Sequence, residues 1–129
     1  MFALSKMKVG LTPPIEYKPA TADESYVVGE ALKVASGAVT KCTGATKPAY
    51  VCVGPANAAG EVPCVEVQDY MEFETTLGVA PAENATVAVG NKVTIHTDGA
   101  SVTATTTSGV AEVLAIDGQT VGSRVVVRF

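Results

Sequence analysis

The sequence of 129 residues contains no tryptophan and a single histidine, and only 17% of its residues are charged. One histidine leaves few general-base or metal-binding schemes open. No G-x-S-x-G, P-loop, G-x-G-x-x-G or H-E-x-x-H motif occurs in the chain. We therefore expect no catalytic, cofactor-binding or metal-binding residues, and a protein that is not an enzyme.

Two further features could carry chemistry, and both have a simpler interpretation. Glu72 and Glu74 would share one face of a strand, and paired carboxylates serve glycoside hydrolysis. Such sites usually also need aromatic sugar platforms, and the lack of tryptophan favours a surface pair. His96 lies between Ile95 and Thr97 in an alternating run, which predicts a solvent-facing strand position.

Long apolar runs and basic clusters are also missing. The longest uncharged stretches, residues 48–60 and 99–111, are 13 residues long, whereas a membrane-spanning helix needs about 20 apolar residues. The net charge is −4, so the basic footprint of a nucleic-acid-binding domain is absent. We expect neither membrane nor nucleic acid as a partner. Acidic residues gather in residues 61–84, which hold no lysine or arginine, and they form either a solvated face or a docking surface for a basic partner.

The three cysteines, Cys42, Cys52 and Cys64, form no C-x-x-C pair. Their odd number argues against a closed disulfide framework. Cys52 and Cys64 lie in valine-rich runs. We interpret the cysteines as small buried hydrophobic residues of a chain that folds in a reducing cytoplasm.

Valine (21 residues), alanine (19), threonine (15) and glycine (12) dominate the chain. Short runs rich in valine, isoleucine and threonine are separated by glycine or proline, and residues 93–97 alternate apolar with polar side chains. The pattern predicts an all-β fold, a compact β-sandwich or barrel of short antiparallel strands. The expected strands are residues 26–29, 32–35, 38–42, 50–53, 62–67, 70–75, 86–89, 92–97, 101–106, 110–116 and 123–129.

The chain contains an internal similarity at an offset of 61 to 63 residues. Val28-Gly29 and the following residues are echoed by Val89-Gly90, and Gly37-Ala38 by Gly99-Ala100. Chance similarity in a chain of this composition is the alternative; we favour a tandem duplication. The sequence thus predicts a β-domain over residues 26–129 with related halves at about 26–75 and 86–129.

Residues 1–25 differ from the rest of the chain. They carry Pro13, Pro14 and Pro19 and show little alternation, so the segment is expected to stay out of a sheet interior. It reads as an extended N-terminal arm. A frayed terminus is the alternative, but the apolar residues of the segment favour an arm that lies on a partner.

The run from Val28 to Thr40, together with the alanine-, valine- and threonine-rich composition and the proline-bearing arm, resembles the small capsid decoration (cement) proteins of tailed bacteriophages. The resemblance implies a virion structural protein, made in the host bacterial cytoplasm, that binds the outer surface of the major capsid protein lattice and stabilises the shell. It implies a homo-oligomer, with a trimer favoured. By analogy, the capsid-binding residues would be Lys6, Met7, Lys8, Val9, Leu11, Ile15 and Tyr17.

Two other classes of function remain open at this point. One is another phage structural component, such as a tail-tube or head–tail joining protein. The other is a carbohydrate-binding or adhesin-like β-module, against which the absence of tryptophan argues.

Overall fold

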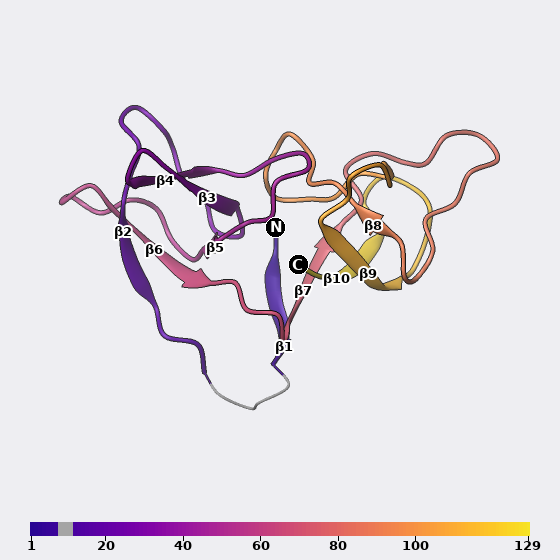
Figure 1. The fold of residues 1–129 in the computed structure, drawn as a ribbon, viewed down its shortest axis with the longest axis horizontal. Coiled ribbons are helices and arrows are strands. Elements are labelled where there is room, and N and C mark those ends of the chain that lie inside the picture. Colours follow the sequence, from indigo (N-terminus) through magenta and orange to yellow (C-terminus); the bar gives the residue numbers. More distant parts are fainter. Residues whose placement is uncertain (8–11) are drawn as a thin grey trace.

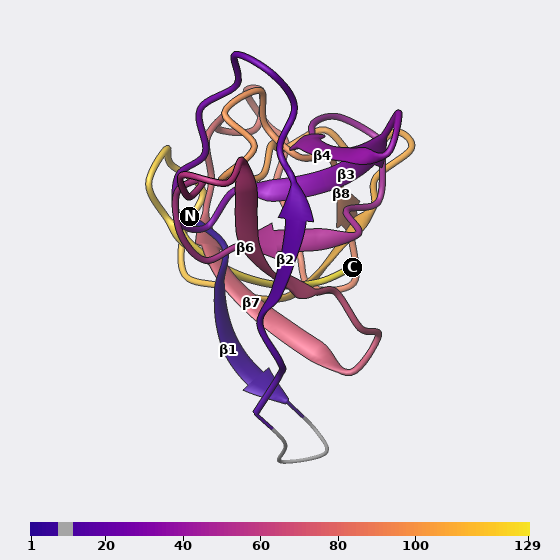
Figure 2. The same ribbon diagram turned by 90° about the vertical axis from the view of Figure 1, so that its left-hand side faces the viewer.

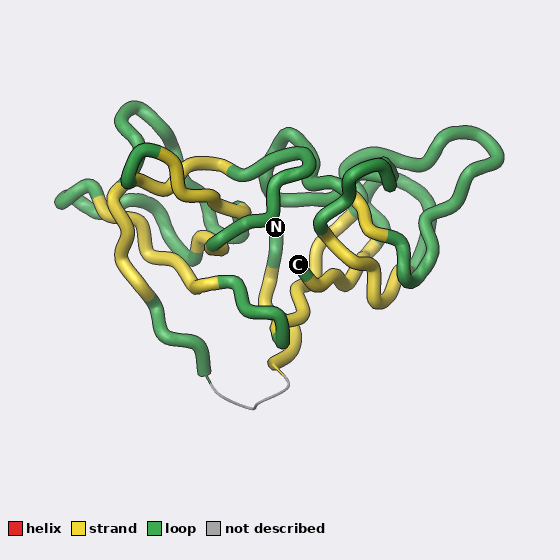
Figure 3. Tube along the Cα trace, viewed as in Figure 1, coloured by secondary structure: helices red, strands yellow, loops and turns green. Residues whose placement is uncertain are grey.

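The protein consists of two five-stranded antiparallel sheets that pack together as an open β-sandwich (Figure 1). The structure, a computed structural model, describes residues 1–7 and 12–129. No helix occurs in this part of the chain (Figure 3). The predicted all-β sandwich is confirmed, and neither sheet closes into a barrel.

Each sheet has one continuous order of strands. The first sheet has the order β2-β6-β5-β3-β4 and contains β2 (Glu16–Pro19), β3 (Ala31–Ala35), β4 (Ala38–Lys41), β5 (Tyr50–Cys52) and β6 (Glu61–Glu66). The second sheet has the order β1-β7-β10-β9-β8 and contains β1 (Ala3–Met7), β7 (Met71–Thr76), β8 (Lys92–Val93), β9 (Ala111–Ile116) and β10 (Arg124–Arg128).

Most predicted strands are present, with their ends shifted by a residue or two. The strands expected at 26–29, 86–89 and 101–106 are wrong: these residues lie in turns and isolated bridges, and the strand expected at 92–97 is reduced to Lys92–Val93. Gly29 and Gly90 explain the first two errors. Their φ angles are +86° and +92°, which turn the chain at the end of each valine run.

The two sheets share one chain topology, with equivalent main-chain hydrogen bonds. The Gly29 amide donates to the Cys52 carbonyl at 2.8 Å, and the Gly90 amide donates to the Val113 carbonyl at the same distance. Both donors and both acceptors are 61 positions apart. β3, β5 and β6 of the first sheet therefore correspond to β8, β9 and β10 of the second.

The correspondence extends to β2 and β7. The Ala20 amide, just after β2, donates to the Gly60 carbonyl at 2.8 Å, and the Leu77 amide, just after β7, donates to the Ser123 carbonyl at 2.9 Å. Ala20 and Leu77 then make equivalent parallel bridges, with Val39 and Val102 respectively. Each of these structural units therefore begins one strand earlier than the corresponding half predicted from the sequence. We call residues 16–66 the first unit and residues 71–128 the second.

The larger of two hydrophobic cores lies between the sheets. It joins Ala31, Cys42, Val51 and Val65 of the first unit to Met71, Phe73, Leu77, Val87, Val93, Ile95, Val102, Ala111, Val113, Val125 and Val127 of the second, with Phe2 and Phe129. The Phe129 ring lies 5.2 Å from the Phe2 ring and 5.6 Å from the Phe73 ring, measured between centroids. The smaller core lies on the first sheet and holds Tyr26, Leu32, Val39, Cys52, Val62 and Cys64.

The N-terminal segment is extended, and it contributes an edge strand to each sheet. β1 pairs only with β7, and β2 pairs only with β6 among the named strands. Pro19 is accommodated because an edge strand has one side on which a missing N–H is harmless. Phe2 anchors the start of the segment in the larger core, so residues 1–7 and 12–25 belong to the sandwich rather than projecting from it.

Asp98 caps the hairpin turn before Val102. Its substitution tests how the free energy of unfolding depends on pH. Its carboxylate accepts hydrogen bonds from the Ala100 amide at 2.8 Å and from the Ser101 amide and hydroxyl at 3.0 and 2.8 Å. Partial burial raises the pKa of Asp98, but these hydrogen bonds and nearby His96 outweigh it and hold the pKa below its ordinary value of 3.8.

A depressed pKa stabilises the fold above pH 3.8, and this contribution is lost as the pH falls through the folded-state value. We expect Asp98→Asn to lower the free energy of unfolding at pH 7 by about 1 kcal/mol, with the difference from the wild type shrinking in strong acid. Urea unfolding of Asp98→Asn and of the wild type, at pH 7 and in strong acid, measures the loss at pH 7 and its decrease in acid. A constant difference at all pH values would contradict the assignment.

Candidate functional site

The N-terminal segment presents its expected partner-binding residues on two different sheets. Lys6 is exposed on β1, whereas Met7 packs against the larger core. Ile15 and Tyr17, each 57% exposed, lie before and within β2. Figure 1 places β2 at the left margin of the molecule and β1 beside β7 near its middle. The structure therefore divides these side chains between two edges rather than gathering them in one patch.

Three further residues predicted to bind the capsid, Lys8, Val9 and Leu11, lie outside the described residues. Close to the described ends of this segment, Met7, Pro13 and Pro14 line a cavity of about 230 Å³ together with Tyr70. The segment thus packs on the connection between β6 and β7.

An apolar groove between β1 and the first sheet escaped the sequence analysis. Its volume is about 230 Å³, and Leu4, Val28 and Val53 are exposed side chains along it. The Phe2 amide donates to the Gly29 carbonyl at 2.8 Å, which holds the start of β1 against the turn that carries Val28. The signal was present in the paired valines Val27-Val28, but this short valine-rich run was interpreted as a strand instead of an exposed turn.

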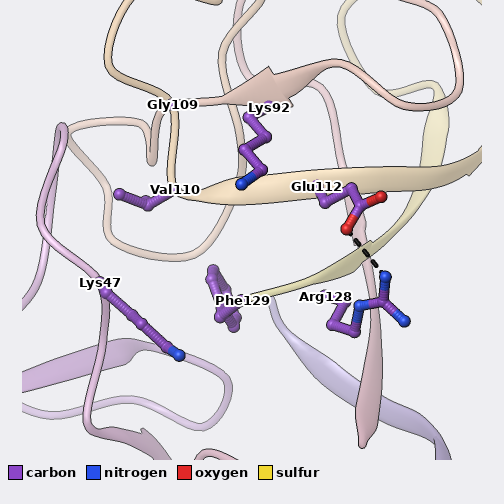
Figure 4. A pocket seen from close by; sticks show the side chains of 7 residues that line it. All are labelled: Lys47, Lys92, Gly109, Val110, Glu112, Arg128 and Phe129. Carbon is purple, nitrogen blue, oxygen red and sulfur yellow. Dashed lines mark hydrogen bonds and ion pairs between the residues drawn. The ribbon is translucent and has the colours of Figure 1, made fainter. Parts of the chain in front are cut away.

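A second cleft, of about 330 Å³, is lined by basic side chains around Phe129 (Figure 4). Two of its three basic side chains are engaged in ion pairs: Arg128 Nη2 lies 2.9 Å from Glu112 Oε2, and Lys47 Nζ lies 3.2 Å from Asp69 Oδ1. The hydrogen bond to Glu112 raises the pKa of Arg128. These contacts pair the charges of Arg128 and Lys47 locally at the surface.

The acidic stretch is spread over several elements. Glu72 and Glu74 do share one face of β7, opposite buried Phe73. Arg124 Nε lies 2.9 Å from Glu74 Oε2, so part of this charge is neutralised within the molecule. A paired-carboxylate site gains no support from this arrangement.

Metal-binding and membrane-spanning features are not found in the described residues. Residues 1–7 and 12–129 contain no group of three or more His, Cys, Asp or Glu side chains that could hold a metal ion. Within the same ranges, no helix is long and apolar enough to cross a membrane. His96 is half-buried, with Nδ1 3.4 Å from Asp98 Oδ2.

The three cysteines are free and buried, as predicted. Burial raises the pKa of the Cys64 thiol to about 11, and the charge of Glu16 adds to the shift. Burial also raises the pKa of Cys42 and of Cys52. Since only the thiolate is nucleophilic, we expect a thiol reagent to leave all three unlabelled in the native protein at pH 7.5 and to label all three in denaturant. Rapid labelling of one native cysteine would contradict this prediction.

Comparison of the chain with protein-family models, with curated proteins and with solved structures gives no significant match.

Proposed function

We propose that the protein is a non-enzymatic virion structural protein that binds the outer surface of a phage capsid and stabilises the shell. The observation that carries this proposal is the N-terminal segment, which supplies an edge strand to both sheets and leaves Lys6, Ile15 and Tyr17 exposed on them. An edge strand offers main-chain hydrogen bonds, and exposed side chains beside it add specificity.

The apolar groove beside β1 supports the same proposal. Exposed apolar side chains at Leu4, Val28 and Val53 provide a surface that a neighbouring protein would cover. A decoration protein makes modest contacts of this kind at many lattice positions, and engagement at several points multiplies weak interactions. The partners would be the major capsid protein lattice and further copies of this chain.

Binding to shells tests the proposal directly. Empty expanded shells of the major capsid protein from the same genome are mixed with the purified protein and sedimented. We expect the wild type to co-sediment, and Val28→Asp to weaken binding by about tenfold, because a charge in the groove must be desolvated on contact. Val121→Asp serves as the matched control, since Val121 is also an exposed valine (66%, against 52% for Val28) but lies outside the groove.

Deletion of residues 1–20 does not isolate the binding surface, because it removes Phe2 and the two N-terminal edge strands, β1 and β2. Point substitutions with unchanged thermal unfolding avoid this difficulty. Absence of wild-type binding to the shells would overturn the proposed function. Rods or rings of the purified protein in electron micrographs would favour a tail-tube component instead.

A further inference from the structure

The second unit is extended by β1, a strand from outside both units, and the first unit has no counterpart of it. In the second unit, β1 covers the outer edge of β7, with Ala3 paired to Glu74. Glu74 pairs on its other side with Val126 of β10. In the first unit, the corresponding pair is Tyr17 of β2 with Pro63 of β6. Tyr17 therefore occupies the place of Glu74, but no strand pairs with its outer side; β4 meets this edge only after Pro19, where Ala20 bridges to Val39.

The main-chain groups of Tyr17 point toward this uncovered edge. Pro63, its partner on β6, has no N–H to donate, and the Pro63 carbonyl accepts a hydrogen bond from the Val53 amide at 3.0 Å. Three residues after Tyr17, the Ala20 amide donates a hydrogen bond to the Gly60 carbonyl at 2.8 Å. Ala20 and Gly60 continue the same antiparallel register. Even-numbered residues of this strand thus bond to β6, and the N–H and C=O of Tyr17 face outward. Figure 2 looks onto β2, with β6 along one of its sides.

We propose that this edge pairs with the same edge of a second copy, antiparallel and with Tyr17 opposite Tyr17. The sequence Ile15-Glu16-Tyr17-Lys18-Pro19 is self-complementary about its centre. In this register, Glu16 of each copy lies opposite Lys18 of the other, and opposite charges on facing strand positions attract. Ile15 lies opposite Pro19, and the two Tyr17 rings lie side by side.

The surroundings of β2 fit a twofold pair. Within one copy, Lys18 Nζ already lies 3.2 Å from Glu16 Oε1, so two copies bring together four charges of alternating sign. Ile15 and Tyr17, 57% exposed in one copy, would be covered by the other. Pro19 has no N–H, which limits the added ladder to a few residues. A twofold contact uses the same patch twice, as a self-complementary segment requires.

The pair can be tested apart from capsid binding and would replace the trimer expected from the resemblance. It assigns Ile15 and Tyr17, counted above among the side chains open to the shell, to the contact between copies, and it leaves Lys6 and the apolar groove for the shell. Its test therefore uses the isolated protein, without shells.

Charge reversal tests the register. Sedimentation velocity of the wild type over a concentration series should show a species of twice the 13.1 kDa chain mass. Glu16→Lys and Lys18→Glu alone should each weaken the pair by about tenfold, because both symmetry-related attractions become repulsions. The double variant should restore it. Lys47→Glu combined with Asp69→Lys reverses another exposed ion pair with the same 3.2 Å distance and should change nothing.

Two substitutions at Tyr17 test the central contact. Tyr17→Pro removes an N–H that does not bond to β6, so it should abolish the pair and leave thermal unfolding unchanged at concentrations where the wild type is monomeric. Tyr17→Cys should form an intermolecular disulfide, since facing Cα atoms about 5.5 Å apart suit one, whereas Val121→Cys, also on an exposed valine, should not. A monomer at every concentration, a trimer, or a dimer unaffected by Tyr17→Pro would each overturn the proposal.

Discussion

Phe2→Ala is expected to lower the free energy of unfolding by about 3–5 kcal/mol, the usual cost of truncating a buried phenylalanine. Phe2 is 2% exposed, and its ring lies edge-on to Phe129 at 5.2 Å. Because Phe129 also contacts Phe73, the cavity left by the substitution would open into the middle of the larger core. The neighbours come from separate strands of the second sheet and cannot all collapse into it.

Urea denaturation of Phe2→Ala and the wild type measures this difference. Val121→Ala, at a site 66% exposed, is the control and should stay within about 0.5 kcal/mol of the wild type. A loss below about 1 kcal/mol for Phe2→Ala would contradict the docking of the N-terminal segment, because surface truncations cost no more than that.

Gly109→Ala is expected to lower the free energy of unfolding by about 3 kcal/mol, from overpacking and the loss of a neighbouring hydrogen bond. A Cβ atom at Gly109 would overlap the main-chain carbonyl of Lys92 and the amide nitrogen of Val93. Main-chain atoms of a strand cannot turn aside as a side chain can. The loop would have to leave β8, which breaks the 3.0 Å hydrogen bond from the Val110 amide to the Val93 carbonyl.

Gly54→Ala is the matched control for this substitution. Its Cβ would meet a single ring carbon of Pro63 at 3.0 Å, and a small shift of that ring relieves the contact. Thermal unfolding of both variants compares a main-chain overlap with a side-chain contact. Equal melting temperatures would show that the loop before Val110 moves freely, contrary to the structure.

Local patterns predicted the strands whose partners are near in sequence. β3 and β4 form a hairpin around Gly37, and alternation with a glycine turn is a short-range signal. β9 and β10 also form a hairpin, through residues 117–123, where Gly122 has a φ angle of +92°. The offset of 61 residues also anticipated real structure, since Gly29 and Gly90 make equivalent turns and equivalent hydrogen bonds.

Partners distant in sequence could not be found in this way. β1 pairs with β7, more than sixty residues later, and no local pattern encodes the pairing of Ala3 with Glu74. The residues of the candidate surface also fall into those expected from the sequence and those found only in the structure. Lys6, Ile15 and Tyr17 were expected by analogy with the decoration proteins, whereas Val28 and Val53 line the groove only because β1 packs beside the first sheet.

The placement of β1 has a consequence for how the protein acquires its fold. All strands of the first sheet lie within residues 16–66, so their pairing partners are present once these residues have been synthesised. β1 must wait for β7, and Phe2 for Phe129, which lies 127 positions later. Contacts of such sequence separation slow folding. We expect two kinetic phases in refolding, with burial of Phe2 in the slower one, and a transient species whose apolar N-terminal strand is open to other chains.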